Sequence, residues 1–235
     1  MRIKDIYNKQ GQYNNSKKRK KAVDDLDDDI LSNIAISDEN EQVRAKAVEK
    51  INNPVILRDI AISDENESIR VKAIRKINDP TILLNLFKNS AEIDDIRQLA
   101  LKRINDSSIL TNIAKNCQDL SFAEIAMMKI DDENILADIA KNSKNYSIRA
   151  KAVKRITNPT VLTDIAKNDP HENVRAKAVA RIDYQDVLRD IAKNDPHDSV
   201  RVKAVKRITN PIDLLEIAKK TKVTKFLPKK KKCNI

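Results

Sequence analysis

A unit of about 26 residues recurs along most of this chain, and it limits what the chain can fold into. An isoleucine or valine followed by leucine marks each copy, and successive copies are 26, 26, 27, 26, 26 and 26 residues apart. An eighth, partial copy begins at Pro211. Because a unit this short cannot bury an apolar face by itself, each copy must stack on its neighbours. The marker residues are Ile30, Ile56, Ile82, Ile109, Ile135, Val161 and Val187.

Each copy predicts two short helices, which we name helix A and helix B. Helix A follows an asparagine or aspartate, as at Asn53–Pro54 and Asn158–Pro159. An asparagine cap before a proline is a helix start signal. Leu162, Ile165 and Ala166 then have the i, i+3, i+4 spacing of one buried helix face. Helices this short are marginal alone, so packing must stabilise them.

Helix B is numbered from the apolar residue before the recurrent arginine, so that Val43 is position 0 of the first copy. Position 4 is alanine and position 8 is isoleucine in all seven full copies. Positions 0, 4 and 8 share one sector of a helix, which predicts that they face the core. Helix B is expected to begin at an aspartate such as Asp38 or Asp64, with Glu41 or Glu67 three residues on completing a capping box.

The spacing of this aspartate and the arginine of helix B resembles the HEAT repeat, and the short period resembles bacterial HEAT-like and leucine-rich-repeat-variant arrays. The resemblance covers most of the chain and implies an all-α fold, a right-handed α-solenoid of about seven and a half two-helix repeats. It also implies a hydrogen-bonded ladder between successive repeats. Ala123 replaces the arginine in the fourth copy, which predicts a less regular middle. The ladder residues are Asp38, Arg44, Asp64, Arg70, Asp169, Arg175, Asp195 and Arg201.

The net charge of +11 is concentrated at the two ends of the chain. Residues 1–22 contain eight basic residues and one acid, residues 219–235 contain eight lysines and no acid, and the rest contains 30 basic and 34 acidic residues. Blocks of like charge are typically disordered and solvated. The sequence therefore predicts a basic, disordered N-terminal tail at 1–23, a HEAT-like helical domain at 24–220 and a Lys-rich C-terminal tail at 221–235.

Basic residues also gather at positions 3, 6 and 7 of helix B, which hold sixteen basic residues and one acid in the seven copies. By the HEAT resemblance these helices line the concave side, so this stripe is expected to face a groove and attract a polyanion. The alternative is a solvated helix face, and position 7 fits it because the helix dipole favours cations near the C-terminus. The basic partner-binding candidates are Lys46, Lys72, Arg75, Lys102, Arg103, Lys129, Lys151, Lys154, Arg155, Lys177, Arg181, Lys203, Lys206 and Arg207.

Three apolar residues interrupt the stripe in the third and fourth copies, namely Leu99, Ile125 and Met128. If they point outward, they form an apolar patch with a basic rim, which is typical of a protein-binding hot spot. The alternative is that an irregular repeat rotates them into the core. Both interpretations remain open from the sequence.

Composition excludes several classes of site. The single glycine, Gly11, lies near the N-terminus, so no glycine-rich phosphate loop or nucleophile elbow can lie in the repeats. Cys117 and Cys233 form no CxxC pair, which favours a cytoplasmic, reducing location without disulfides or structural zinc. His171 and His197 are interpreted as polar helix-start residues rather than a metal pair. No membrane span, catalytic residue, metal or cofactor is predicted.

Three functions follow from these features. The favoured hypothesis is a non-enzymatic scaffold that binds an acidic protein partner along the basic stripe and the central apolar patch. The alternative is a nucleic-acid-binding protein that contacts a duplex backbone, since three Phe, four Tyr and no Trp leave few platforms for base stacking. Some HEAT-like proteins are DNA glycosylases and some short-repeat relatives handle bilin chromophores, but neither set of motifs appears here.

Overall fold

The computed structural model describes residues 16–89 and 94–220, which form sixteen α-helices and no strand. Residues 1–15 of the predicted N-terminal tail (1–23) and the whole predicted C-terminal tail (221–235) lie outside these ranges. The chain divides into two compact units, residues 1–109 and 110–235, and each is described by itself. Helix α9 (Ser107–Asn116) spans the division.

The first unit contains α2 (Ser16–Ala22), a 3₁₀ turn (Val23–Asp25), α3 (Asp28–Ser37), α4 (Glu41–Lys50), α5 (Pro54–Ser63), α6 (Glu67–Lys76), α7 (Pro80–Asn89) and α8 (Asp94–Arg103). The second contains α10 (Leu120–Met128), α11 (Glu133–Asn142), α12 (Tyr146–Val153), α13 (Pro159–Asn168), α14 (Glu172–Val179), α15 (Gln185–Asn194), α16 (Asp198–Val205) and α17 (Pro211–Lys220).

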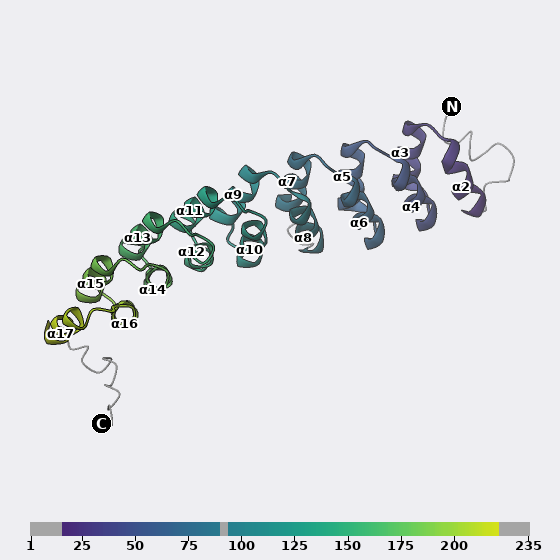
Figure 1. Cartoon of the computed structure of the whole chain (residues 1–235). Coiled ribbons are helices and arrows are strands. Elements are labelled where there is room, and N and C mark those ends of the chain that lie inside the picture. Colours follow the sequence, from purple (N-terminus) through teal and green to yellow (C-terminus); the bar gives the residue numbers. More distant parts are fainter. Residues whose placement is uncertain (1–15, 90–93, 221–235) are drawn as a thin grey trace, which may run out of the picture. The chain divides into compact units, whose positions relative to one another are not determined.

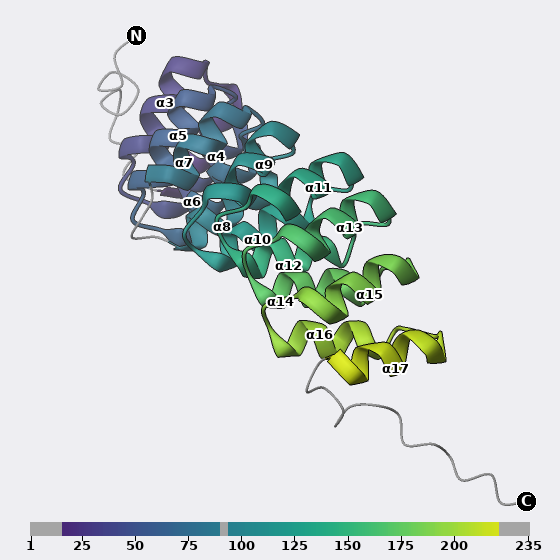
Figure 2. The ribbon, with the colours of Figure 1, turned by 90° about the vertical axis from the view of Figure 1, so that its left-hand side faces the viewer.

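The helices pack as successive adjacent pairs, which confirms an all-α, repeat-like architecture. In the first unit α3, α5 and α7 form a row of A helices, and α4, α6 and α8 form a row of B helices (Figure 1). In the second unit α12, α14 and α16 stack as B helices beside the A helices α11, α13 and α15 (Figure 2). Within each unit these B helices therefore contact both their own helix A and the helix B of the next copy.

The constant positions of helix B are the core. The alanine at position 4 is fully buried in all seven copies, for example Ala47 and Ala178, each 0% exposed. The isoleucine at position 8 is also buried throughout, including Ile51 and Ile182. An alanine here lets neighbouring helices approach closely, because it has no side chain beyond Cβ to hold them apart.

The predicted caps are confirmed for helix A and wrong for helix B. The Asn53 side chain accepts hydrogen bonds from the backbone N–H groups at the start of α5, and Pro54 is the first helical residue. Helix B does not begin at the aspartate. Asp38 instead ends α3, and its carboxylate accepts a hydrogen bond from the N–H of Asn40, 2.9 Å away. Asn40 is the N-cap of α4, two residues later than predicted.

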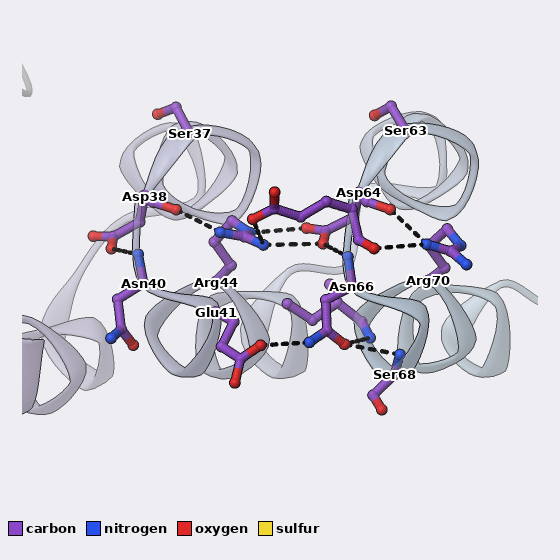
Figure 3. A network of polar contacts seen from close by, with 12 residues as sticks. Ser37, Asp38, Asn40, Glu41, Arg44, Ser63, Asp64, Asn66, Ser68 and Arg70 are labelled. Carbon is purple, nitrogen blue, oxygen red and sulfur yellow. Dashed lines mark hydrogen bonds and ion pairs between the residues drawn. The ribbon is translucent and has the colours of Figure 1, made fainter.

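The aspartate does not cap helix B because its carboxylate pairs with an arginine of the preceding copy. Arg44 donates to both carboxylate oxygens of Asp64, with Nε–Oδ2 and Nη2–Oδ1 distances of 2.9 and 3.1 Å (Figure 3). Its Nη1 donates to the backbone carbonyl of Asp38, at 2.9 Å. One guanidinium thus connects the turns of two successive copies. The side chains of Arg44 and Asp64 are only 6% and 4% exposed.

The same rungs recur in the second unit. Arg149 pairs with Asp169, and Arg175 pairs with Asp195, each through Nε and Nη2. Arg149 was not among the predicted ladder residues, because its own turn carries Ser143 in place of aspartate. Its Nη1 donates to the Ser143 backbone carbonyl, so this end of the rung needs no particular side chain. Arg70 and Arg201 likewise donate to the backbone carbonyls of Asp64 and Asp195.

The first rung lies inside the segment predicted as a disordered tail. Residues 16–22 of that segment form α2, which packs on α4. Arg19, 6% exposed, binds the Asp38 carboxylate through Nε and Nη2. Its place in α2 matches that of Arg44 in α4, since both stand three residues before an Ala-Val pair. Helix α2 therefore occupies the position of a helix B ahead of the first full copy.

A second row of charges joins the A helices of the second unit. The lysine near the end of one helix pairs with an acid of the next, as in Lys141–Asp164 at 2.6 Å and Lys167–Asp190 at 3.1 Å. Hydrogen bonds from Lys141 and Asn168 hold the pKa of Asp164 below its ordinary value. These pairs are largely exposed, so each contributes little to stability.

This row predicts a small pH-dependent stability. Because the folded pKa of Asp164 lies below the unfolded value of about 4, its contribution is present above that pH and is lost as the pH falls through the folded pKa. We expect Lys141→Gln to lower the melting temperature slightly at pH 7, by an equivalent of about 0.5 kcal/mol, and not at pH 2. Thermal melts of Lys154→Gln, whose lysine has no ion-pair partner among the described residues, are the control. An equal loss at both pH values would contradict a role for Asp164.

Candidate interaction surface

Five of the seven basic residues at position 7 of helix B bind backbone carbonyls at the end of the preceding helix B. Arg155 donates from Nη1 to the carbonyl of Met127 at 2.9 Å and from Nη2 to that of Ile130 at 2.7 Å. Arg181 donates to the carbonyls of Lys154 and Ile156, both at 2.8 Å. The last carbonyls of a helix have no partner within the helix, so these cations satisfy them across the repeat. Lys76, Arg103 and Arg207 make the equivalent bonds to backbone carbonyls.

This second set of contacts changes the interpretation of the stripe. Arg103, Arg155, Arg181 and Arg207 were predicted to bind a partner, and the structure uses their guanidinium groups to join copies. Lys129, the equivalent residue of α10, is half-buried. The position-7 cations are thus in part structural, which the sequence indicated only through their place at the helix C-terminus.

Several lysines at position 3 are paired with acids of the preceding copy. Lys46 pairs with Asp24, which follows α2, and Lys72 pairs with Glu49 on α4. In the second unit Lys151 pairs with Glu124 on α10. Hydrogen bonds from Lys46 and Lys50 lower the pKa of Asp24, and a hydrogen bond from Lys72 lowers that of Glu49. The positive charge of the stripe is therefore locally neutralised at these three places.

Four lysines of the second unit stay exposed, on the stacked helices α14 and α16 or at the C-caps of α12 and α16. They are at positions 3 and 6, and none has a carboxylate within ion-pair distance among the described residues. Each copy advances by the distance between packed helices, about 8 to 10 Å. We call these residues the lysine cluster: Lys154, Lys177, Lys203 and Lys206. In the first unit Arg75 is also exposed, and Lys102 is exposed and donates to the side chain of Gln98.

The three apolar residues that interrupt the basic stripe differ in their exposure. Met128 is 71% exposed at the end of α10, whereas Ile125 and Leu99 are half-buried. Leu99 belongs to the first unit and the other two to the second, so a single patch of three residues is not described. Within the second unit Met128 is at position 6, the position that Lys154 and Lys206 occupy in later copies.

The histidines lie at helix starts, in agreement with their interpretation as helix-start residues. His171 is the N-cap of α14, where its Nδ1 accepts a hydrogen bond from the N–H of Asn173 at 3.2 Å, and its ring stacks on Tyr146 with centroids 3.8 Å apart. His197 is the N-cap residue of α16. Among the described residues no group of three or more His, Cys, Asp or Glu side chains is arranged to hold a metal ion. Each described helix is too short or too polar to cross a lipid bilayer.

Comparison with protein-family models found no family that matches the chain. Searches of curated proteins and of solved structures also gave no match. What this chain does must therefore be inferred from the arrangement of its side chains.

Proposed function

We propose that this chain is a HEAT-like, right-handed solenoid and a non-enzymatic scaffold that binds an acidic protein segment in the cytoplasm. The proposed binding face consists of the lysine cluster and, at its α10 end, Met128. The proposal extends the predicted seven and a half repeats by the further half repeat that α2 represents.

The observation that carries the proposal is the contrast among the basic residues of helix B. Lys72 and Lys151 have carboxylate partners, and Arg155 and Arg181 bind carbonyl groups. The lysine cluster has neither kind of partner among the described residues. Cations that no intramolecular group uses are the ones available to a polyanion, and their summed field raises the rate and strength of association.

The spacing suits an extended peptide. One copy advances by about 8 to 10 Å, and an extended chain advances by about 3.3 to 3.6 Å per residue, so acids three residues apart can meet lysines of successive copies. Met128 adds an adaptable apolar contact, which a peptide side chain can use and a phosphate backbone cannot. This contact favours a protein ligand over the nucleic-acid alternative.

The proposal is tested with the full chain and two labelled probes. One probe is a peptide with leucine followed by glutamate at every third residue, and the other is a random-sequence duplex DNA. Changing all four residues of the lysine cluster to glutamine is expected to weaken peptide binding at least about tenfold, because each exposed charge contact contributes some tenths of a kcal/mol. The matched control changes Lys115, Lys141, Lys167 and Lys193 on the A helices to glutamine.

Two outcomes oppose the proposal. Equal losses in the two variants would mean that only net charge matters. Tighter binding of the duplex than of the peptide at physiological salt, with a steep salt dependence that the lysine-cluster variant reduces, would instead support nucleic-acid binding.

A further inference from the structure

The first two copies share an identical stretch at the end of helix A. Residues 34–40 and 60–66 both read IAISDEN. Most of these letters have structural roles, since the first Ile and Ala are buried, the Asp forms a ladder rung and the Asn caps helix B. The second isoleucine and the glutamate do not follow from packing. Ile36 is 54% and Ile62 is 44% exposed, and the side chains of Glu39 and Glu65 are 82% and 81% exposed.

Later copies carry different residues at both places. Where the first copies have the exposed isoleucine, the A helices α11, α13 and α15 have Lys141, Lys167 and Lys193. Where they have the exposed glutamate, the later turns have other residues, as at Gln118, Lys144 and Pro170. The fold thus accepts lysine at the isoleucine position, and the exposed apolar side chain is a local property of the first two copies.

Ile36, Glu39 and Glu65 line a hollow between the ends of α3 and α5. It has a volume of about 320 Å³, and its apolar lining consists of the exposed Ile36 and the buried Ala35 and Ile60. The polar wall contains Asp38 and Asp64 with Arg44 between them. Figure 3 shows Ser37 above Asp38 and Ser63 above Asp64. Glu39 and Glu65 complete the lining.

The hollow has an excess of negative charge. Arg19, Arg44 and Arg70 are the guanidinium groups that bind here, and the carboxylates are those of Asp38, Glu39, Asp64 and Glu65, which leaves a local charge of −1. Each aspartate uses both oxygens on its arginine, whereas each glutamate binds a guanidinium through Oε1 only. The exposed glutamates can therefore accept a further cation.

We propose that this hollow binds a lysine or arginine side chain from a peptide segment of a partner protein. The aliphatic part of that side chain lies along Ile36, and its charged end lies between Glu39 and Glu65, as long basic side chains do when an apolar surface ends at an acidic rim. This site has the opposite charge preference to the lysine cluster and does not depend on the proposed function.

The test is a titration of the isotope-labelled full chain, observed by NMR. The probe is the blocked peptide Gly-Leu-Lys-Leu-Gly, and the same peptide with glutamine in place of lysine is its control. We expect the lysine peptide to change the chemical shifts of the backbone amides of residues 36–39 and 62–65. We also expect it to bind at least tenfold more tightly than the glutamine peptide. Glu39→Gln with Glu65→Gln should remove this preference, and Ile36→Lys should weaken binding while preserving the fold, because lysine occupies this position in later copies.

Glu67→Gln, an exposed acid on α6 that does not line the hollow, is the matched control and should bind as the unchanged chain does. The proposal is overturned if both peptides bind equally, or if the double glutamine variant binds as well as the Glu67 variant. It also fails if these amides shift on dilution without any peptide, since a second copy of the chain would then fill the hollow.

Discussion

Replacing Arg175 by methionine is expected to lower the free energy of unfolding of the second unit by about 3 to 5 kcal/mol, the range seen when one partner of a buried ion pair is removed. Arg175 is 4% exposed, and its guanidinium binds both oxygens of Asp195 at 2.8 and 3.0 Å. Methionine keeps much of the side-chain volume, so the loss of stability arises mainly from the Asp195 carboxylate, which is left buried without its arginine partner. The loss of the bond to the Asp169 carbonyl adds to it.

Urea denaturation followed by circular dichroism measures this loss. Arg201→Met is the matched control, because Arg201 occupies the same position in α16 but is half-buried and pairs with the exposed Asp198. We expect the control to cost about 1 kcal/mol, the typical contribution of a hydrogen bond. Equal losses for the two variants would show that burial of the rung does not determine its contribution.

Repetition made the core predictable from the sequence. Alanine at position 4 and isoleucine at position 8 recur in every copy because each copy meets the same neighbours, and all fourteen side chains are buried. The caps of helix A were also predictable, since Asn53–Pro54 is a local signal. The start of helix B was not, because Asp38 and Asp64 use their carboxylates on arginines 19 or 20 residues earlier. A capping rule that considers only local residues cannot include that competition.

The candidate site was less predictable than the core, because charge alone does not show which cations are already paired. Arg181 and Lys177 are both basic residues of helix B, four residues apart on α14 and the turn that follows. The structure gives Arg181 two carbonyl partners and leaves Lys177 exposed. To distinguish them, one must know which residues of successive B helices lie opposite one another. The repeat period implies this register, whereas the composition does not.

The helix at residues 16–22 was also difficult to predict from the sequence, for a related reason. Five basic residues in a row, Lys17–Lys21, resemble a solvated tail, and this charge obscured the Arg-x-x-Ala-Val pattern of helix B. Aligning Arg19, Ala22 and Val23 with Arg44, Ala47 and Val48 would have revealed it. The exposed lysines of α2 coexist with a buried face, as terminal repeats of such arrays often combine a polar outer side with a packed inner one.

Helix α2 is therefore expected to act as the N-terminal cap of the array, and Val23→Asp tests this role. Val23 is 0% exposed, and a carboxylate there would be buried without a partner, which costs several kcal/mol unless the helix detaches. Detachment would also break the rung between Arg19 and Asp38. We expect hydrogen exchange of the amides in α2 and α4 to accelerate at least about 100-fold, equivalent to a loss of about 2.7 kcal/mol in local stability.

Lys20→Asp is the control, because it introduces the same side chain on the exposed face of α2. It should change exchange in α4 by less than about threefold, since surface substitutions of this kind alter stability by about 0.5 kcal/mol or less. If Val23→Asp leaves the protection of α4 unchanged, α2 does not stabilise the first full copy, and α4 must be stable without a helix B before it. If protection falls in α4 but not in the amides of α12 and α14, the cap acts locally, as expected for an array in which each copy contacts only its neighbours.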